Sequence, residues 1–281
     1  MYKITAKEQL APGIFRMLIE APRVAAKARP GHFVVLRTHE AGERIPLTIV
    51  STTEAGEVEV IFQVMGKTTA YLAGMQVGDG LPTFLGPLGV APEVPEGPGT
   101  VLCVAGGVGA APILPRAKDY SQRGWKVLTI LGARNEDLLI LEDRLAEVSS
   151  ALYISTDDGS KGHKGFVTDL IPELAQKEEI SEVLAIGPVP MMAAVTKVTR
   201  KLALPTTVSL NALMVDGTGM CGACRVSVGG ETKFTCVDGP EFDGHQVDFA
   251  QLRQRLVQYL EEEKLALDRY KKEGECQCLN G

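Results

Sequence analysis

A short segment near residue 220 gathers the side chains of this chain that are best suited to bind a metal. Cys221 and Cys224 stand in C-x2-C spacing, and Cys236 follows in the same window. The first residues, MYKITAKEQL, contain no apolar core of a signal peptide, so we expect a reducing, cytoplasmic protein. In such a chain, clustered cysteines favour a metal site over a disulfide framework.

The spacing around these cysteines indicates an iron–sulfur site with one unusual ligand. Four thiolates normally hold a 2Fe-2S cluster, and one known pattern is C-x4-C-x2-C followed by a fourth Cys. Asp216 stands where that pattern has its first Cys, and a carboxylate oxygen is a harder donor than a thiolate. We therefore predict a 2Fe-2S cluster held by Asp216, Cys221, Cys224 and Cys236. The alternatives are a structural zinc site, cysteines without a metal, and Asp216 as a turn residue only.

The remaining cysteines predict no second metal site. Cys103 lies in an apolar run, which is typical of a small core residue. Cys276 and Cys278 stand in C-x-C spacing near the end of the chain, and we interpret them as unliganded thiols in a loose tail.

A glycine-rich turn at 106–112 is a candidate for binding the pyrophosphate of a dinucleotide. Gly107 and Gly109 follow an apolar run and would let the backbone approach phosphate, and Pro112 would fall in the first helical turn. A tight strand–helix connection without a ligand is the alternative. Later strand ends should border the same crevice, since ligands bind beyond the carboxyl ends of parallel strands. These strand ends supply Gly132, Arg134, Gly187, Pro188 and Met191.

Two acidic residues end another predicted strand. Asp157 and Asp158 would repel a 2′-phosphate and accept a hydrogen bond from a ribose hydroxyl, which favours NAD(H) over NADP(H). A solvated acidic turn is the alternative.

The elements that must position these residues fall into distinct parts. Short β-type runs separated by turns fill the first ~95 residues, and a Pro- and Gly-rich segment follows at 91–99. Strands then alternate with helices, the pattern of a parallel sheet. We expect a turn followed by a helix within 107–124, and helices at 136–148, 166–176, 191–202 and 246–272.

This order predicts a multidomain fold that combines β with α/β structure. An antiparallel β-barrel at 1–97 precedes a Rossmann-like parallel-sheet domain at 98–205. A small cluster module at 206–247 and a C-terminal helix and tail at 248–281 complete the chain. The length of 281 residues suits two or three small domains.

Composition excludes several classes of function. The net charge of −6 argues against a nucleic-acid partner, and no apolar stretch is long enough to cross a membrane.

Together these motifs resemble the ferredoxin reductase-like flavoprotein superfamily. Within it, the chain is similar to electron-transfer subunits related to those of dihydroorotate dehydrogenase and of NADH-dependent reduced ferredoxin:NADP+ oxidoreductase. The most specific piece is VDGTGMCGACRVSVGG, followed by FTCVDGPEFDGH, with Asp at the first ligand position.

The resemblance implies FAD on the N-terminal barrel. The run Arg44-Ile45-Pro46-Leu47-Thr48 is similar to the flavin strand of the superfamily, in which the Arg meets the pyrophosphate and the hydroxyl lies near flavin N5. A second phosphate-binding turn is implied at Val64, Gly66, Lys67, Thr68 and Thr69.

The resemblance further implies an oxidoreductase subunit that exchanges a hydride between NAD(H) and FAD. Electrons would pass through the cluster to or from a larger flavin and iron–sulfur subunit of a heterodimer that bifurcates electrons. Ferredoxin would be reached only through that partner, and no residue of this chain is expected to act as a catalytic acid, base or nucleophile. The alternatives are a dihydroorotate dehydrogenase electron-transfer subunit, which should carry Cys at position 216, a sulfide or polysulfide reductase component, and a non-enzymatic module with structural zinc.

Overall fold

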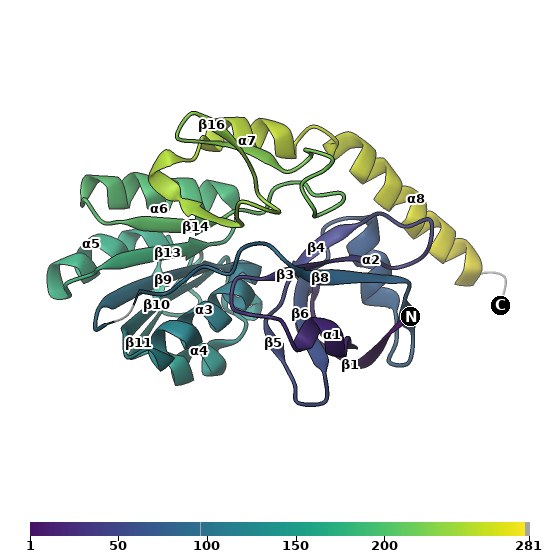
Figure 1. The fold of residues 1–281 in the computed structure, drawn as a ribbon, viewed down its shortest axis with the longest axis horizontal. Helices are drawn as coiled ribbons and strands as arrows, with labels where there is room; N and C mark the ends of the chain where they lie inside the picture. Colours follow the sequence, from purple (N-terminus) through teal and green to yellow (C-terminus); the bar gives the residue numbers. More distant parts are fainter. Residues whose placement is uncertain (96, 279–281) are drawn as a thin grey trace.

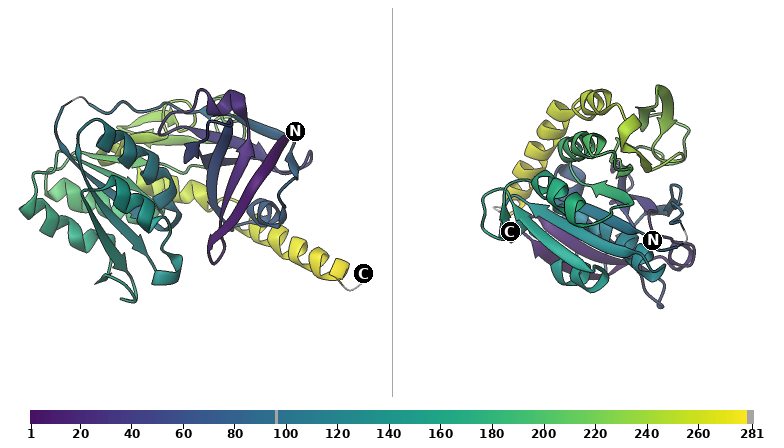
Figure 2. Two further views of the ribbon diagram at one scale, coloured as in Figure 1. Left: turned by 90° about the horizontal axis from the view of Figure 1, so that it is seen from below. Right: turned by 90° about the vertical axis from the view of Figure 1, so that its left-hand side faces the viewer.

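The computed structural model describes residues 1–95 and 97–278, arranged in three connected parts (Figure 1). Antiparallel strands form one end of the molecule, and a parallel sheet flanked by helices forms the other. The cysteine segment lies across the junction of the two, and a long C-terminal helix runs from it along the antiparallel end (Figures 1 and 2). None of the helices in the described ranges is both long and apolar enough to cross a membrane.

Two antiparallel sheets make up the N-terminal part and confirm the predicted barrel architecture. Their strand orders are β5-β6-β2-β1-β7 and β4-β3-β8. Apolar side chains from both sheets, such as Ile4, Leu36 and Val60, meet in one buried core. The strands are β1 (Tyr2–Ala11), β2 (Ile14–Glu20), β3 (Phe33–Arg37), β4 (Ile45–Thr48), β5 (Ser51–Thr52), β6 (Glu57–Gln63), β7 (Gly80–Leu81) and β8 (Thr83–Leu88). Two short helices complete this part, α1 (Pro22–Ala25) and α2 (Lys67–Gly74).

The second part is a seven-stranded sheet in the order β12-β11-β10-β9-β13-β14-β17, parallel except for β17. Its central strands are buried on both faces because helices cover each side. Along β9, Val101 and Cys103 face the core under α3 and α4, whereas Leu102 and Val104 face the core under α5 and α6. The burial of Cys103 confirms it as a core residue.

The bounds of this sheet and its helices are as follows. The strands are β9 (Thr100–Gly106), β10 (Lys126–Ala133), β11 (Ala151–Thr156), β12 (His163–Lys164), β13 (Glu182–Ile186), β14 (Thr206–Ser209) and β17 (Glu241–Asp243). The helices are α3 (Ala110–Gln122), α4 (Glu142–Val148), α5 (Val167–Lys177) and α6 (Val189–Lys201).

Both ends of the cysteine segment are connected to strands of the parallel sheet. It leaves the sheet after β14 and returns in β17, which pairs antiparallel with β14. Between them, β15 (Arg225–Val228) and β16 (Glu231–Phe234) form a hairpin. Gly229 and Gly230 turn this hairpin at φ of 61° and 81°, a conformation that favours glycine.

Two helices differ from their predicted form. The helix expected at 136–148 begins only at Glu142, after a single helical turn at Glu136–Leu138. The C-terminal helix is divided into α7 (Phe249–Leu256) and α8 (Leu260–Cys278), because α7 packs on β15 while α8 packs on α2. The prediction of a loose tail at 274–281 was wrong for 274–278, since α8 continues to Cys278, and 279–281 lie outside the described residues.

Candidate functional site

A cavity of about 400 Å³ lies where all three parts meet. The barrel contributes β4 and the end of β6, and the parallel sheet contributes the turn after β9 and the end of β13. The segment 209–214, which leads into the cysteine loop, closes the remaining side. The predicted residues that line this cavity are Pro46, Leu47, Thr48, Thr69, Gly107, Gly109, Pro112, Gly187 and Pro188.

The glycine-rich turn has the shape that a phosphate-bearing ligand requires. Gly107 has a φ of 55°, and a Cβ placed there would meet open space, so a ligand can approach this backbone. Gly109 serves packing instead, because a Cβ there would collide with the carbonyl of Ile186. Pro112 lies in the first turn of α3, as predicted, where the helix requires no N–H from it.

The second predicted phosphate site is the N-terminus of α2. Gly66 precedes the helix, and a Cβ there would meet open space. The Thr69 hydroxyl accepts hydrogen bonds from the N–H groups of Met65 and Gly66, at 2.9 and 3.0 Å. The Thr68 hydroxyl donates to the Glu43 carboxylate at 2.9 Å. Both hydroxyls therefore shape the turn, and the N–H groups of the first helical turn are the donors best placed for phosphate.

Other residues predicted at the flavin lie outside the lining of this cavity. Arg44 and Lys67 are exposed at the ends of β4 and α2, where long side chains can reach a ligand. Val64 lies beside Gln63 and Met65, and these two neighbours line the cavity in its place.

The predicted nucleotide residues at the strand ends fall into two groups. Arg134, Asp157 and Asp158 come together, since the N–H of Asp157 donates to Ala133 at 3.1 Å and that of Asp158 to Arg134 at 3.2 Å. Hydrogen bonds from the hydroxyl and N–H of Ser160 lower the pKa of Asp158. Both acidic side chains are exposed at the carboxyl edge of the sheet.

The second group consists of residues that allow close packing at the strand ends. A Cβ on Gly132 would collide with Val167 of α5, so this glycine lets helix and strand pack closely. Met191 lies against Gly106 and Gly187, the two glycines that bring the ends of β9 and β13 together.

In the cysteine loop, Cys224 and Cys236 are buried side by side, with 3.2 Å between their sulfurs. Burial raises the pKa of the Cys236 thiol to about 12, and the hydrogen bond from Cys224 adds to this. The Cys236 thiol therefore does not ionise readily by itself. A bound cation reverses that preference by stabilising thiolates, so this pair fits a metal or cluster site.

Asp216 and Cys221 take other positions in the same loop. The Asp216 carboxylate accepts N–H groups from Thr218 at 2.8 Å and from Cys221 at 2.6 Å. The bond from Thr218 is the main cause that lowers the pKa of Asp216. Cys221 is exposed, next to Met220, whose exposed fraction is 88%.

Among the side chains that the structure describes, no three metal-binding groups converge. The donor types nevertheless suit iron: three thiols and a carboxylate share one loop, and Gly217, Gly219 and Gly222 all have positive φ. The four-residue ligand set stays a prediction. The side chains of Cys276 and Cys278, predicted to be unliganded, lie outside the described ones.

The cysteine loop rests directly on the cavity. A Cβ on Gly217 would meet Val35 and Leu88 of the barrel, both at 2.8 Å, so the loop backbone lies against that wall. Met214, only two residues before Asp216, lines the cavity itself. Sequence reasoning missed Met214 and its neighbours Ser209 and Asn211. Ser209 is the last residue of β14 and the other two follow it, so the rule that ligands bind at strand ends was the available signal.

Comparisons with known proteins agree with this geometry. Residues 211–248 match the iron–sulfur cluster binding domain of dihydroorotate dehydrogenase B, and residues 103–197 match an oxidoreductase NAD-binding domain. A Thermotoga maritima protein named as a homolog of the dihydroorotate dehydrogenase B (NAD+) electron transfer subunit is 47% identical, over 96% of this chain and 95% of its own length. A Streptococcus pneumoniae subunit of that name is 34% identical, over 85% and 94%.

Two solved structures extend the comparison. A chain from the structure of NADH-dependent reduced ferredoxin-NADP oxidoreductase, solved to study flavin-based electron bifurcation, has a TM-score of 0.91 and 45% identity. The match covers 96% of this chain and 98% of the other. A ferredoxin reductase of carbazole 1,9a-dioxygenase matches with a TM-score of 0.63 at 20% identity, over 73% and 65%, which shows the shared fold alone.

Proposed function

Since the chain belongs to the family of dihydroorotate dehydrogenase B-type electron-transfer subunits, we propose that it links NADH to a larger partner subunit of an electron-bifurcating NADH-dependent reduced ferredoxin:NADP+ oxidoreductase. At the coarser level, the chain is an oxidoreductase electron-transfer subunit with FAD, NAD(H) and an iron–sulfur cluster. When bound, FAD supplies two-electron exchange with NAD(H) and one-electron exchange with the cluster.

The residues around the cavity suggest how the flavin is held. Pro46, Leu47 and Thr48 line it from the barrel, and Thr48 would present its hydroxyl to the flavin edge. Gly66 and the first turn of α2 would bind the pyrophosphate, with Arg44 and Lys67 adding positive charge. The largely apolar lining would exclude water from the hydride path.

The nucleotide would enter from the opposite wall. Gly107 leaves room for its pyrophosphate above the N-terminus of α3, and Gly187 and Pro188 border the place for the nicotinamide. Asp157 and Asp158 would face the adenosine ribose. No acid or base is needed from this chain, because a hydride carries its own electron pair.

The cluster would be the exit for single electrons. We propose Asp216, Cys221, Cys224 and Cys236 as its ligands. We also propose that the chain divides into four parts, 1–97, 98–205, 206–247 and 248–281. Met214 at the cavity and Asp216 in the loop are two residues apart, so a cluster held by this loop would lie close to a flavin in the cavity. The exposed Cys221 and Met220 mark the side that a partner would approach.

One observation carries the choice of the bifurcating enzyme: the match to its chain combines 45% identity with coverage of 96% of this chain and 98% of the other. The Thermotoga maritima homolog matches as fully, so the contrast lies with the less similar subunits named for dihydroorotate dehydrogenase B. Subunits named for dihydroorotate dehydrogenase B from Desulforamulus reducens and Clostridium perfringens align over 96–97% of their own length but only 87–88% of this chain. This chain therefore contains sequence that those subunits lack.

The electron-transfer subunit of a dihydroorotate dehydrogenase B is the second candidate, favoured by the names of most relatives. Purification of the native complex from its source cells separates the two. We expect NADPH to drive the joint reduction of ferredoxin and NAD+, with no oxidation of dihydroorotate. Dihydroorotate-dependent reduction of NAD+ by the purified complex would instead establish the second candidate.

A further inference from the structure

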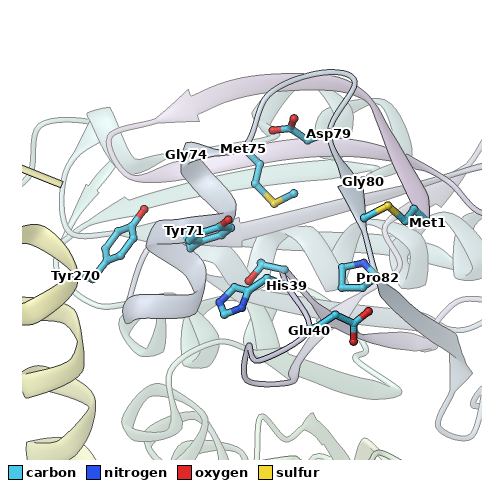
Figure 3. A pocket seen from close by; sticks show the side chains of 11 residues that line it. Met1, His39, Glu40, Tyr71, Gly74, Met75, Asp79, Gly80, Pro82 and Tyr270 are labelled. Carbon is cyan, nitrogen blue, oxygen red and sulfur yellow. The ribbon is translucent and has the colours of Figure 1, made fainter. Parts of the chain in front are cut away.

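A second cavity, of about 600 Å³, is lined mainly by residues of the barrel part (Figure 3). The loop after β3 contributes Thr38, His39 and Glu40 to its wall, and α2 contributes Tyr71 and Gly74. Tyr270 reaches in from α8 (Figure 3). Its volume is within the range of small-molecule sites.

Three aromatic rings from separate elements stand together at this cavity. The rings of His39 and Tyr71 are 5.1 Å apart between centroids, and those of Tyr71 and Tyr270 are 6.1 Å apart. Tyr270 lies over the last turn of α2, where a Cβ on Gly74 would come 3.7 Å from its hydroxyl. Such a group of rings suits a planar heteroaromatic base, which stacks on aromatic side chains.

The second cavity is joined to the first by two elements. Thr69, in the first turn of α2, lines the first cavity, and Gly74 at the end of that helix lines the second. The eight residues of α2 span about 12 Å. On the neighbouring ladder, Thr48 lines the first cavity and pairs with Phe33, while Thr38 lines the second about 17 Å along. An extended dinucleotide covers such a distance.

The charged side chains around the second cavity indicate which end of a ligand would bind there. The described side chains around the second cavity include the carboxylates of Glu40 and Asp79 and no lysine or arginine. Arg37, outside this lining, neutralises Glu40 through an ion pair of 3.1 Å. The lining therefore offers no cation of its own to a phosphate, whereas the Asp79 carboxylate can accept a hydrogen bond from an amino group of a base. The positive charges of Arg44 and Lys67 lie instead near the N-terminal end of α2.

We infer that the second cavity binds the adenine end of FAD and that Tyr270 of the C-terminal helix completes this subsite. The inference rests on the proposed function, which places the flavin ring in the first cavity and the pyrophosphate at α2. It gives α8 a role in holding the cofactor. FMN lacks the adenosine part and therefore does not use this subsite.

The test compares FAD with FMN on the flavin-free full-length chain. Titration should give a dissociation constant for FAD that rises about 5- to 100-fold in Tyr270→Leu, because leucine keeps the packing but loses the stacking surface. Tyr270→Phe should keep the affinity for FAD. FMN should bind equally well to the wild-type chain and to both variants. Tyr259→Leu is the matched control, since Tyr259 is 47% exposed and lies outside the cavity.

Unchanged FAD affinity in Tyr270→Leu would overturn the inference, as would an equal loss of FAD and FMN. Binding of AMP to the FAD-loaded protein at this cavity would also overturn it, by showing a separate nucleotide site. Reduction of the bound FAD by NADH is measured in parallel. If it fails in the wild-type chain, the proposed function is at fault, whereas normal reduction with Tyr270-independent FAD binding rejects only the adenine subsite.

Discussion

At the scale of single residues, Asp216 holds the cysteine loop together. Its carboxylate accepts two backbone N–H groups, and one of them belongs to Cys221, a predicted ligand of the same cluster. The structure thus shows the turn role that the sequence left as an alternative. A carboxylate has further lone pairs, so these bonds do not by themselves prevent an oxygen from binding iron.

Substitutions of Asp216 distinguish its proposed role as an iron ligand from its role in the turn. Asp216→Cys should still assemble a 2Fe-2S cluster, with altered EPR g-values and reduction potential, because thiolate is a softer donor. Asp216→Ala should lose the cluster or slow transfer to the partner, while reduction of FAD by NADH is largely spared. Asp216→Asn keeps an acceptor for the loop and is the control. Spectra and potentials that do not change in Asp216→Cys and Asp216→Asn would leave Asp216 with the turn role alone.

Two residues of the barrel test the proposed position of FAD. Gly66→Val should fold normally, because a Cβ at this position meets open space, but its side chain should exclude the phosphates. Thr48→Ala should weaken retention of FAD more mildly, by the loss of one hydrogen bond. Flavin content after desalting measures both effects. Full retention in both variants would place FAD on other residues, and thermal unfolding checks that the fold is intact.

At the scale of elements, the carboxyl end of β11 presents the acidic pair at the sheet edge. The backbone N–H groups of Asp157 and Asp158 bond to the end of β10, so both residues are held beside Arg134. The Asp158 carboxylate is engaged by Ser160. The geometry leaves Asp157 as the better candidate for contact with a ribose.

This arrangement predicts a preference for NADH over NADPH. Stopped-flow reduction of the flavin should be faster with NADH, since two carboxylates repel a 2′-phosphate. Asp157→Asn should narrow the difference in kcat/KM between the two nucleotides by about tenfold. Glu173→Gln, a substitution at an exposed position of α5, should not change the difference in kcat/KM between the two nucleotides. Equal use of both nucleotides by the wild-type chain would refute the acidic-turn argument.

At the scale of the whole molecule, a buried carboxylate joins the barrel to the parallel-sheet part. Glu59 of β6 is 1% exposed and receives both NH groups of Arg144 from α4, at 2.7 and 2.9 Å. Arg16 donates to it at 2.6 Å. Burial alone would raise the pKa of Glu59, but the hydrogen bonds from Arg144, Ser51 and Arg16 outweigh it and lower the pKa to about 2.

This contact makes the free energy of unfolding depend on pH in the acidic range. The folded pKa of Glu59 is below its ordinary value of 4.5, so its contribution is complete above about pH 4.5 and is lost as the pH falls towards 2. It is on the order of 3 kcal/mol. Arg144→Met should lower the free energy of unfolding by about 1–3 kcal/mol at pH 7. The exposed pair of Lys177 and Glu173 provides the control Lys177→Met, which should change it by less than about 1 kcal/mol.

Chemical denaturation between pH 3 and pH 7 provides the measurement. Glu59→Gln should be less stable at pH 7 and should lose less stability on acidification than the wild-type chain. An Arg144→Met variant as stable as Lys177→Met would show that the contact between the two parts contributes little.

Features that depend on local pattern could be predicted from the amino-acid sequence. The alternation of apolar strands with helices predicted the parallel sheet, and Gly107 with Pro112 predicted its first turn, because chain direction and backbone freedom are set within a few residues. The cysteine spacing likewise predicted the cluster domain that the comparisons identify.

Contacts between residues far apart in the chain could not be predicted in this way and are known from the folded structure. Met214 and Met65 became cavity walls, Tyr270 met Tyr71, and Arg144 met Glu59 across 85 positions of the chain. No local period carries such information, since these contacts follow from the packing of whole elements against one another. The division of the last helix has the same cause, because α7 and α8 pack on different parts of the molecule.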